Sequence, residues 1–328
     1  MKKYHLAAAL ATLVAAAPAL AAGPSLTAIG MTDGFTINTF YTDNGVGASY
    51  PLLGAVAASD GSLIGSGYAY GKLLKFNEGA GNTVNGLGFG DAILTANTPG
   101  TPTGIARAGS DVYVNIIGTG IFKVNPGTLA TTQLGTIQPT YGLWGTPDGN
   151  LVTSTGGGVY KVDTTSGAAT LVGNASNPDG VTVSPDGSIA YAEVSGHILG
   201  YSLTSIAPNA PVFDSGFLFG GPDGTGVISG GAFNGDIIVN MNDGTLHLLT
   251  PNGLGGISGD DTIASGGERG DLVSPDANNG CLLVTNYRSA SRLCIDSGTI
   301  GSDVPEPASM ALLGGGLLGL GALRRRRR

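Results

Sequence analysis

Residues 142–164 read GLWGTPDGNLVTSTGGGVYKVDT, and residues 180–202 read GVTVSPDGSIAYAEVSGHILGYS. In both stretches a short apolar run is followed by Pro-Asp-Gly, a second apolar run, a further turn and a third run. Asp and Gly satisfy the backbone demands of a tight turn, with the positive φ falling on Gly. The pattern therefore predicts antiparallel strands that are joined by hairpins.

Weaker copies of this pattern begin at Gly54, Gly104, Gly226 and Gly270, which makes six units of about 40 residues. Short apolar runs separated by turn residues indicate an all-β chain. A sheet of four strands cannot bury both faces alone, so such units pack face to face around an axis. We predict a six-bladed β-propeller over residues 23–303. A β-solenoid is the alternative, because Gly-Asp turns occur there too.

The segment GFTINTF, residues 34–40, precedes the first copy of the repeat. It has the composition of a strand but no hairpin partner next to it in sequence. We expect it to supply the outer strand of the last blade and so to close the ring.

The repeat units resemble those of the NHL and SMP-30/gluconolactonase-like propellers, in which S-P-D-G turns and strands ending in K-V-D recur. SPDG at residues 184–187 and YKVD at residues 160–163 carry the resemblance here. It implies a propeller fold. It also implies a metal-dependent enzyme activity as an alternative, because SMP-30-like enzymes hold a divalent metal on the channel axis with a set of Glu, Asn and Asp side chains.

One residue of each second strand falls at an equivalent position near the expected central channel. These residues are Ser66, Asn115, Ser154, Glu193, Asn240 and Asn286. Carboxylate and amide oxygens suit a hard cation, so Glu193, Asn115, Asn240 and Asn286 are candidate ligands for Ca²⁺ or another divalent metal. The acid that the SMP-30-like family carries before its blade-one strand has no counterpart at Leu52 or Leu53. A polar, water-filled channel is the alternative.

Other polar residues are explained by the fold. Pro-Asp-Gly tripeptides contain Asp148, Asp179, Asp186 and Asp223, for which we predict turn roles only. We expect Trp144 to pack between blades rather than to form a platform for a sugar. Arg269-Gly270-Asp271 is interpreted as a chance tripeptide. Because the sequence contains no G-x-S-x-G, H-E-x-x-H or phosphate loop, we assign no catalytic residue.

Residues 1–22 have the composition of a signal peptide. Lys2 and Lys3 precede an apolar run that is short for a membrane span, and Ala19-Leu20-Ala21 has the small residues that a signal peptidase requires. We predict cleavage after Ala21 or Ala22. An uncleaved anchor helix is the alternative.

At the other end, Pro305, Glu306 and Pro307 are followed by an uncharged run, residues 308–323, and a basic anchor of Arg324, Arg325, Arg326, Arg327 and Arg328. Residues 304–328 resemble the PEP-CTERM sorting signal of Gram-negative bacteria. The resemblance implies cleavage near Pro-Glu-Pro by an exosortase-type membrane peptidase, and an association with exopolysaccharide and biofilm. We expect residues 308–323 to form a transmembrane helix with the arginines on the cytoplasmic side. A permanent single-span anchor is the alternative.

The two signals hide the charge of the body. The whole chain has a net charge of −8, whereas the part between the signals has 8 basic and 22 acidic residues and a net charge of −14. Such an acidic surface argues against nucleic acid or anionic lipid as a partner. It is compatible with divalent cations or simply with solubility.

Cys281 and Cys294 are the two cysteines of the chain. In an exported protein such a pair tends to be oxidised. The sequence between them predicts two strands around a turn near Tyr287 and Arg288, which places the two cysteines opposite each other. We therefore predict a cross-strand disulfide.

Two functions agree with these observations. The first is an exported cell-surface or extracellular-matrix protein whose propeller is a binding platform for polysaccharide or protein. The second is a metal-dependent lactone hydrolase or lyase. The missing acid at the first blade favours the binding platform. We expect export through the inner membrane, transient anchoring, and a final place on the cell surface or outside the cell.

Overall fold

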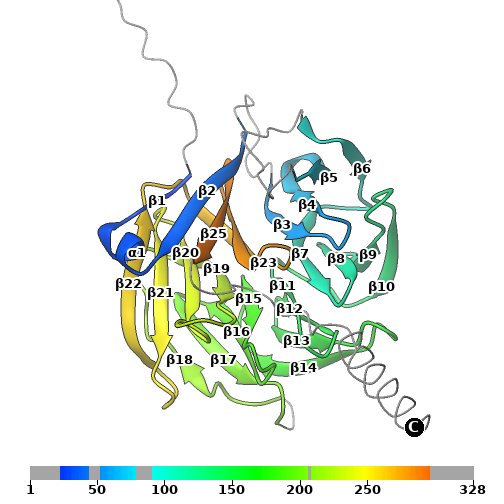
Figure 1. The fold of residues 1–328 in the computed structure, drawn as a ribbon. Helices are drawn as coiled ribbons and strands as arrows, with labels where there is room; N and C mark the ends of the chain where they lie inside the picture. The colour runs from blue at the N-terminus through cyan, green and yellow to red at the C-terminus, as the bar shows by residue number, and fades with distance from the viewer. Residues whose placement is uncertain (1–22, 44–51, 79–90, 206–207, 296–328) are drawn as a thin grey trace, which may run out of the picture.

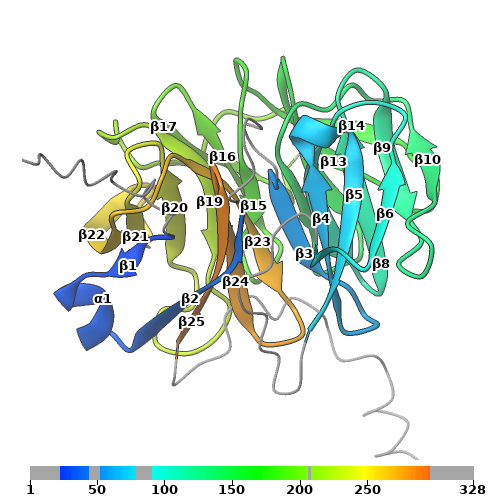
Figure 2. The same ribbon diagram turned by 90° about the horizontal axis from the view of Figure 1, so that it is seen from above.

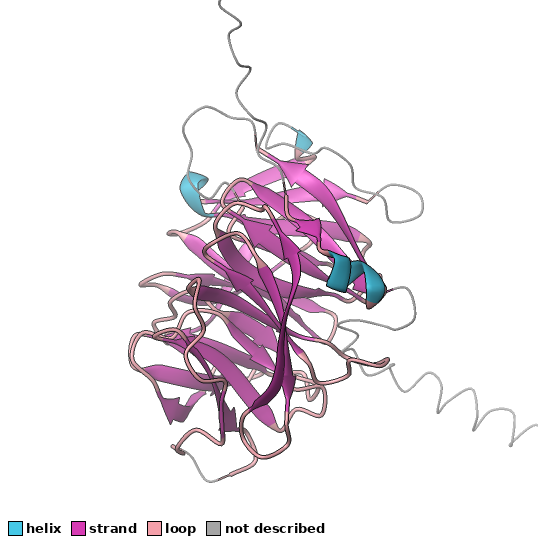
Figure 3. Ribbon diagram, turned by 90° about the vertical axis from the view of Figure 1, so that its left-hand side faces the viewer, coloured by secondary structure: helices cyan, strands magenta, loops and turns pink. Residues whose placement is uncertain are grey.

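A computed structural model of the chain describes residues 23–43, 52–78, 91–205 and 208–295. Regular structure in these residues is nearly all β, as Figure 3 shows, with one short α-helix, α1 (Ala28–Thr32), and one 3-10 helix, η1 (Tyr68–Tyr70). The strands form six antiparallel sheets. Figure 1 shows these sheets arranged around a centre, and Figure 2 shows them after a turn of 90°. The predicted six-bladed propeller is confirmed.

Each sheet is one blade, numbered 1 to 6 in chain order from β3. Blade 1 contains β3 (Gly54–Ala57), β4 (Ser62–Gly67), β5 (Lys72–Asn77) and β6 (Leu94–Asn97). Blade 2 contains β7 (Pro102–Ala108), β8 (Asp111–Ile116), β9 (Gly120–Val124) and β10 (Thr131–Gly135). Blade 3 contains β11 (Leu143–Gly145), β12 (Leu151–Thr155), β13 (Gly158–Val162) and β14 (Ala169–Asn174).

The second half of the ring repeats this plan. Blade 4 contains β15 (Val181–Val183), β16 (Ile189–Val194), β17 (His197–Ser202) and β18 (Phe213–Asp214). Blade 5 contains β19 (Pro222–Val227), β20 (Ile237–Met241), β21 (Leu246–Pro251) and β22 (Ile257–Ser265). Blade 6 contains β23 (Gly270–Asp276), β24 (Cys281–Asn286) and β25 (Ser289–Ile295). The first strand of each blade contacts that of the next, and β23 contacts β3, so the ring is closed.

The N-terminal part of the body completes blades 5 and 6. β2 (Phe35–Thr42) pairs antiparallel with β25 as the outermost strand of blade 6, which confirms the predicted closure (Figure 1). β1 (Ser25–Leu26) pairs with β22 and gives blade 5 a fifth strand, which the sequence analysis did not predict. A strand of two residues is too short to show an alternating pattern.

The predicted Pro-Asp-Gly hairpins are present between the first and second strands of blades 3 and 4. Gly149 and Gly187 have φ values of 82° and 74°, which a residue with a Cβ seldom adopts. In the second hairpin the Asp186 carboxylate accepts hydrogen bonds from Ser184 Oγ at 2.6 Å and from Ser188 N at 3.0 Å. The turn roles predicted for Asp148 and Asp186 are thus confirmed.

Apolar side chains fill the spaces between neighbouring sheets. Trp144, on β11, is 0 % exposed and lies in a core cluster with residues of blades 3, 4, 5 and 6. It therefore packs between blades, and it presents no surface to a sugar. This confirms the packing between blades that was predicted for Trp144.

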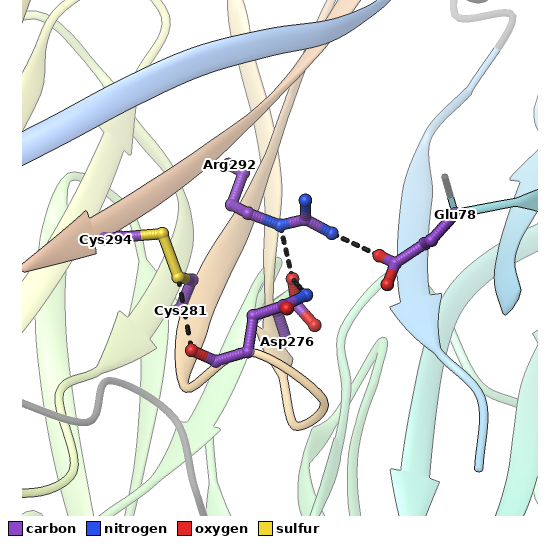
Figure 4. The surroundings of a disulfide bond; sticks show 6 residues. Glu78, Asp276, Cys281, Arg292 and Cys294 are labelled. Carbon is purple, nitrogen blue, oxygen red and sulfur yellow. Dashed lines mark hydrogen bonds and ion pairs between the residues drawn. A yellow bond between two sulfur atoms is a disulfide. The ribbon is translucent and has the colours of Figure 1, made fainter. Parts of the chain in front are cut away.

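The hairpin of β24 and β25 carries the predicted disulfide between Cys281 and Cys294, whose Cα atoms are 4.5 Å apart (Figure 4). The neighbouring pairs Leu282↔Leu293 and Leu283↔Arg292 have the expected register. Next to the disulfide, Arg292 Nε donates to Asp276 Oδ2 at 2.5 Å, and Arg292 Nη2 contacts Glu78 Oε1. Because Glu78 follows β5, this buried cluster joins blade 6 to blade 1.

Candidate functional site

The first strands approach one another closely, and glycine makes this possible. A Cβ at Gly142 would lie 2.6 Å from the carbonyl oxygen of Asp179, and one at Gly180 would lie 2.7 Å from that of Asp223. A Cβ at Gly224 would likewise collide with the carbonyl oxygen of Asp271. Each of these glycines, at or near the start of a first strand, thus packs against the backbone of the next blade. Leu53, Tyr141, Asp179 and Asp223 each stand just before such a glycine, whereas Asp271 follows Gly270.

These residues form part of an axial cavity of about 230 Å³. Leu53, Tyr141, Asp179, Asp223 and Asp271 come from the starts of five first strands, and they are joined by Tyr68 of η1 and Arg269, just before β23. Blades 4, 5 and 6 therefore each supply one carboxyl group to the same cavity. Blades 1 and 3 supply an apolar and an aromatic wall.

The three carboxyl groups differ in their partners. Arg269 Nη2 lies 3.7 Å from Asp223 Oδ2, and Arg269 Nε donates to Asn242 Oδ1 at 2.5 Å. Asp271 is only 5 % exposed, and its Oδ2 atom is buried with no hydrogen-bond partner among the described residues. A buried carboxylate oxygen without a donor is unfavourable. The cavity is therefore incomplete without a donor or a proton.

The electrostatics of the cavity favour protonated carboxyl groups. Burial, followed by the charge of Asp223, raises the pKa of Asp179. Burial raises the pKa of Asp223, although Arg269 opposes it, and burial raises the pKa of Asp271 far above its usual value. Burial also raises the pKa of the neighbouring Glu193 to about 7. Raised pKa values of several carboxyl groups in and beside one cavity are typical of functional sites.

The polar residues predicted on the second strands do lie at equivalent positions. Ser66 pairs with Gly54, Asn240 with Gly224, and Asn286 with Gly270. Their side chains are buried among the strands, however, and they do not line the axial cavity.

The amides of this set join neighbouring blades. Asn115 Nδ2 donates to the carbonyl oxygen of Gly142 at 2.8 Å, and Asn240 Nδ2 donates to that of Asp271 at 3.0 Å. Asn286 Nδ2 lies 3.3 Å from Asn240 Oδ1. Asn240 therefore fixes the backbone of a cavity residue.

The metal assignment of Glu193, Asn115, Asn240 and Asn286 stays a prediction. The Glu193 carboxylate accepts the Gly196 N–H at 2.8 Å, and the Nδ2 groups of Asn115 and Asn240 donate to the next blade. The Oδ1 atoms of Asn115 and Asn286, which a cation would bind, are buried without a hydrogen-bond partner among the described residues. In the part of the chain that the structure describes, no three His, Cys, Asp or Glu side chains come close enough together to hold one metal ion. The described acids thus do not form a metal centre by themselves.

The turn role predicted for two cavity residues is wrong. Asp179 and Asp223 do not serve turns, because Gly180 and Gly224 lack the positive φ that Gly149 and Gly187 have. The same tripeptide here leads into a first strand. Arg269 and Asp271, interpreted as part of a chance tripeptide, also line the cavity. The available signal was the position before the glycine that starts a first strand, which is acidic at Asp179 and Asp223.

Residues 303–328 match the family model of the PEP-CTERM protein-sorting motif. The tail is a sorting signal. This confirms the resemblance that the sequence indicated, and it implies export and an exosortase-type processing partner. The predicted signal peptide, transmembrane run and arginine anchor lie outside the described residues. Among the residues that are described, no helix has the length and apolar character needed to cross a membrane.

No curated protein matches the chain, but many solved structures do. A gluconolactonase from Xanthomonas campestris has a TM-score of 0.61 at 13 % identity, with 84 % of this chain and 95 % of that chain covered. A luciferin-regenerating enzyme has a TM-score of 0.58 at 14 % identity, with coverage of 83 % and 99 %. The calcium-binding protein regucalcin from Agrobacterium tumefaciens has a TM-score of 0.54 at 14 % identity, with coverage of 80 % and 96 %. Identities this low show a shared propeller fold only.

Proposed function

We infer that the chain works outside the inner membrane as an exosortase-processed binding module, and that the axial cavity is its ligand site. We expect the processed body to act at the cell surface or in the extracellular matrix, with a polysaccharide component as the ligand. The sorting motif supports the place of action. The cavity supports the mode of action.

The observation that carries this proposal is the convergence of Asp179, Asp223 and Asp271 from three consecutive blades on one cavity. Nothing in the propeller fold requires carboxyl groups at these positions, because Leu53 and Tyr141 fill the equivalent positions of blades 1 and 3. Burying three acids beside one guanidinium lowers stability. Residues that lower the stability of a fold and have no structural role indicate a functional site.

A metal-dependent lactonase or lyase is the second candidate, because propellers of similar fold include a gluconolactonase. The donor set fits that activity less well. The acidic ligand expected before the first strand of blade 1 is replaced by Leu53, and the described acids do not gather around one point. We therefore place the binding module first.

The proposal is tested by thermal denaturation of the full exported chain with a panel of probes. The panel consists of glucose, N-acetylglucosamine, glucuronate, glucosamine, CaCl₂ and MgCl₂. We expect at least one of the sugars to raise the melting temperature of the wild type, because a ligand that binds only the folded state stabilises it. The same sugar should have no effect on Asp179→Asn.

Asp261→Asn is the matched control, because Asp261 is an exposed acid of blade 5 that lies outside the cavity. This variant loses the same charge and should respond like the wild type. If no sugar shifts the wild type, or if Asp179→Asn responds equally, the cavity is not the ligand site. One divalent ion per purified chain, lost in Asp179→Asn, would favour the metal enzyme instead.

A further inference from the structure

The cavity has more negative than positive groups, and this bears on the kind of ligand that the proposed function requires. Asp179, Asp223 and Asp271 face one cation, Arg269, among the described residues that line the cavity. That guanidinium already lies 3.7 Å from the Asp223 carboxylate and binds Asn242. A second positive group near Asp179 and Asp271 would therefore stabilise the ionised forms of these two carboxyl groups.

Asp271 supplies an observation that is independent of the charge count. Its Oδ2 atom is buried and has no partner in the described part of the chain, although the residue is held firmly by the bond between Asn240 and its own carbonyl oxygen. An ionised carboxylate can only accept hydrogen bonds. A cation beside Asp271 would favour this ionised form, and the group that the Oδ2 atom then requires is a hydrogen-bond donor. Hydrogen bonds that involve ionised groups are about twice as strong as those between neutral groups.

A bare metal ion suits this arrangement poorly. Calcium draws its oxygen ligands to within about 2.3–2.6 Å, so several side chains must converge on one point. The described acids show no such convergence, and the cavity of about 230 Å³ is far larger than one ion. An organic cation can reach separate carboxylates because it carries its N–H and O–H donors at different places on a larger body.

The other residues that line the cavity indicate what the uncharged part of that cation is. Tyr68 and Tyr141 line the cavity, and Tyr141 is 36 % exposed. Tyrosine rings attract cations over their faces and stack against sugar rings, while their hydroxyl groups bond to other hydroxyls. Leu53 adds a small apolar surface. The volume is below that of a drug-sized site and suits a single ring.

We propose that the axial cavity binds an amino sugar, with its ammonium group beside the carboxylate of Asp271, its hydroxyl groups toward Asp179 and its ring against Tyr68 and Tyr141. This inference rests on the proposed function, because it names the ligand class of the same cavity. The source is a polysaccharide that carries free amino groups, of which one sugar unit enters the cavity.

The test is calorimetric titration of the full exported chain at pH 7 and low salt with three probes that differ at one position: glucosamine, N-acetylglucosamine and glucose. We expect glucosamine to bind at least ten times more tightly than the other two. Asp271→Asn should weaken glucosamine at least tenfold and leave glucose unchanged. Asp179→Asn is the second variant, in case Asp271→Asn does not fold, and Asp261→Asn should behave like the wild type.

The outcomes separate the two proposals. Equal affinity for glucosamine and glucose, lost in Asp179→Asn, would leave the cavity as the ligand site but would overturn the amino-sugar inference. Glucosamine binding that survives in both cavity variants would overturn it as well. Absence of binding by all three probes would overturn the inference, and the wider panel would then decide the proposed function.

Discussion

Asp271 is the residue at which burial and charge oppose each other most strongly. Its raised pKa means that the folded chain keeps a proton that the unfolded chain releases above about pH 4. The free energy of unfolding that this group contributes therefore falls as pH rises through the neutral range. Asp271→Asn removes this loss, and we expect it to stabilise the protein by about 1–3 kcal/mol more at pH 8 than at pH 5. Melting temperatures of both proteins at both pH values check this, and an equal difference at the two pH values would contradict it.

Gly180 tests the packing that places the acids at the axis. Gly180→Ala puts a Cβ 2.7 Å from the carbonyl oxygen of Asp223, so two first strands must separate. We expect a loss of about 1–3 kcal/mol, as for other overpacked sites. Gly157→Ala is the control, since its Cβ would meet nothing within 4 Å and its φ is not positive, and we expect a change within about 0.5 kcal/mol. Chemical denaturation measures both, and similar effects of the two substitutions would count against the account.

The limits of sequence reasoning are visible at single aspartates. Asp186 and Asp223 both stand in Pro-Asp-Gly, yet one closes a hairpin and the other lines the cavity. The tripeptide fits both positions. In the hairpin Gly187 adopts a positive φ, and in the first strand of blade 5 Gly224 allows the backbone of the next blade to come close. Local chemistry cannot separate these uses. Only the position of the tripeptide within the repeat does so.

The β24–β25 hairpin shows what an element adds to the ring. The disulfide between Cys281 and Cys294 closes a loop of the chain with a sequence separation of 13 residues. Replacing both cysteines by alanine frees the unfolded chain, and we expect a loss of about 2–3 kcal/mol. Thermal unfolding of the variant is compared with that of the wild type in reductant, which should match it. A variant as stable as the oxidised wild type would show that the disulfide contributes nothing.

Arg292, on the same hairpin, holds blade 6 against blade 1. Arg292→Met leaves the carboxylates of Asp276 and Glu78 buried without their cation, which costs about 3–5 kcal/mol. Lys123→Met is the control, because its pair with Asp111 is exposed and contributes about 0–1 kcal/mol. Denaturant midpoints distinguish the two. If both substitutions had the same small effect, the buried cluster would not support ring closure.

At the scale of the whole molecule, the repeat predicts the architecture because each unit carries its own turns and apolar runs. The six blades and the closure by β2 follow from that pattern. β1 and α1 do not, since both are too short for a periodic signal and are held by their contact with β22. The cavity also escapes prediction, because it is formed by residues from separate blades that meet only after the ring closes.

The Pro-Glu-Pro motif of the sorting tail is predicted to control the processing of the whole chain. Changing Pro305 and Pro307 to Ala disrupts the motif that the family model matches. We expect the variant to stay membrane-bound at full length, whereas the wild type is shortened. Fractionation with immunoblotting of the body measures this. Normal shortening and release of the variant would refute processing at Pro-Glu-Pro.

Binding at the axial cavity is tested by a crystal structure of the exported chain with the sugar that stabilises it most in the thermal panel. We predict density for that sugar in the cavity, with a donor atom about 3 Å from Oδ2 of Asp271. Density for the sugar only elsewhere on the propeller, with water alone beside Asp271, would contradict the claim.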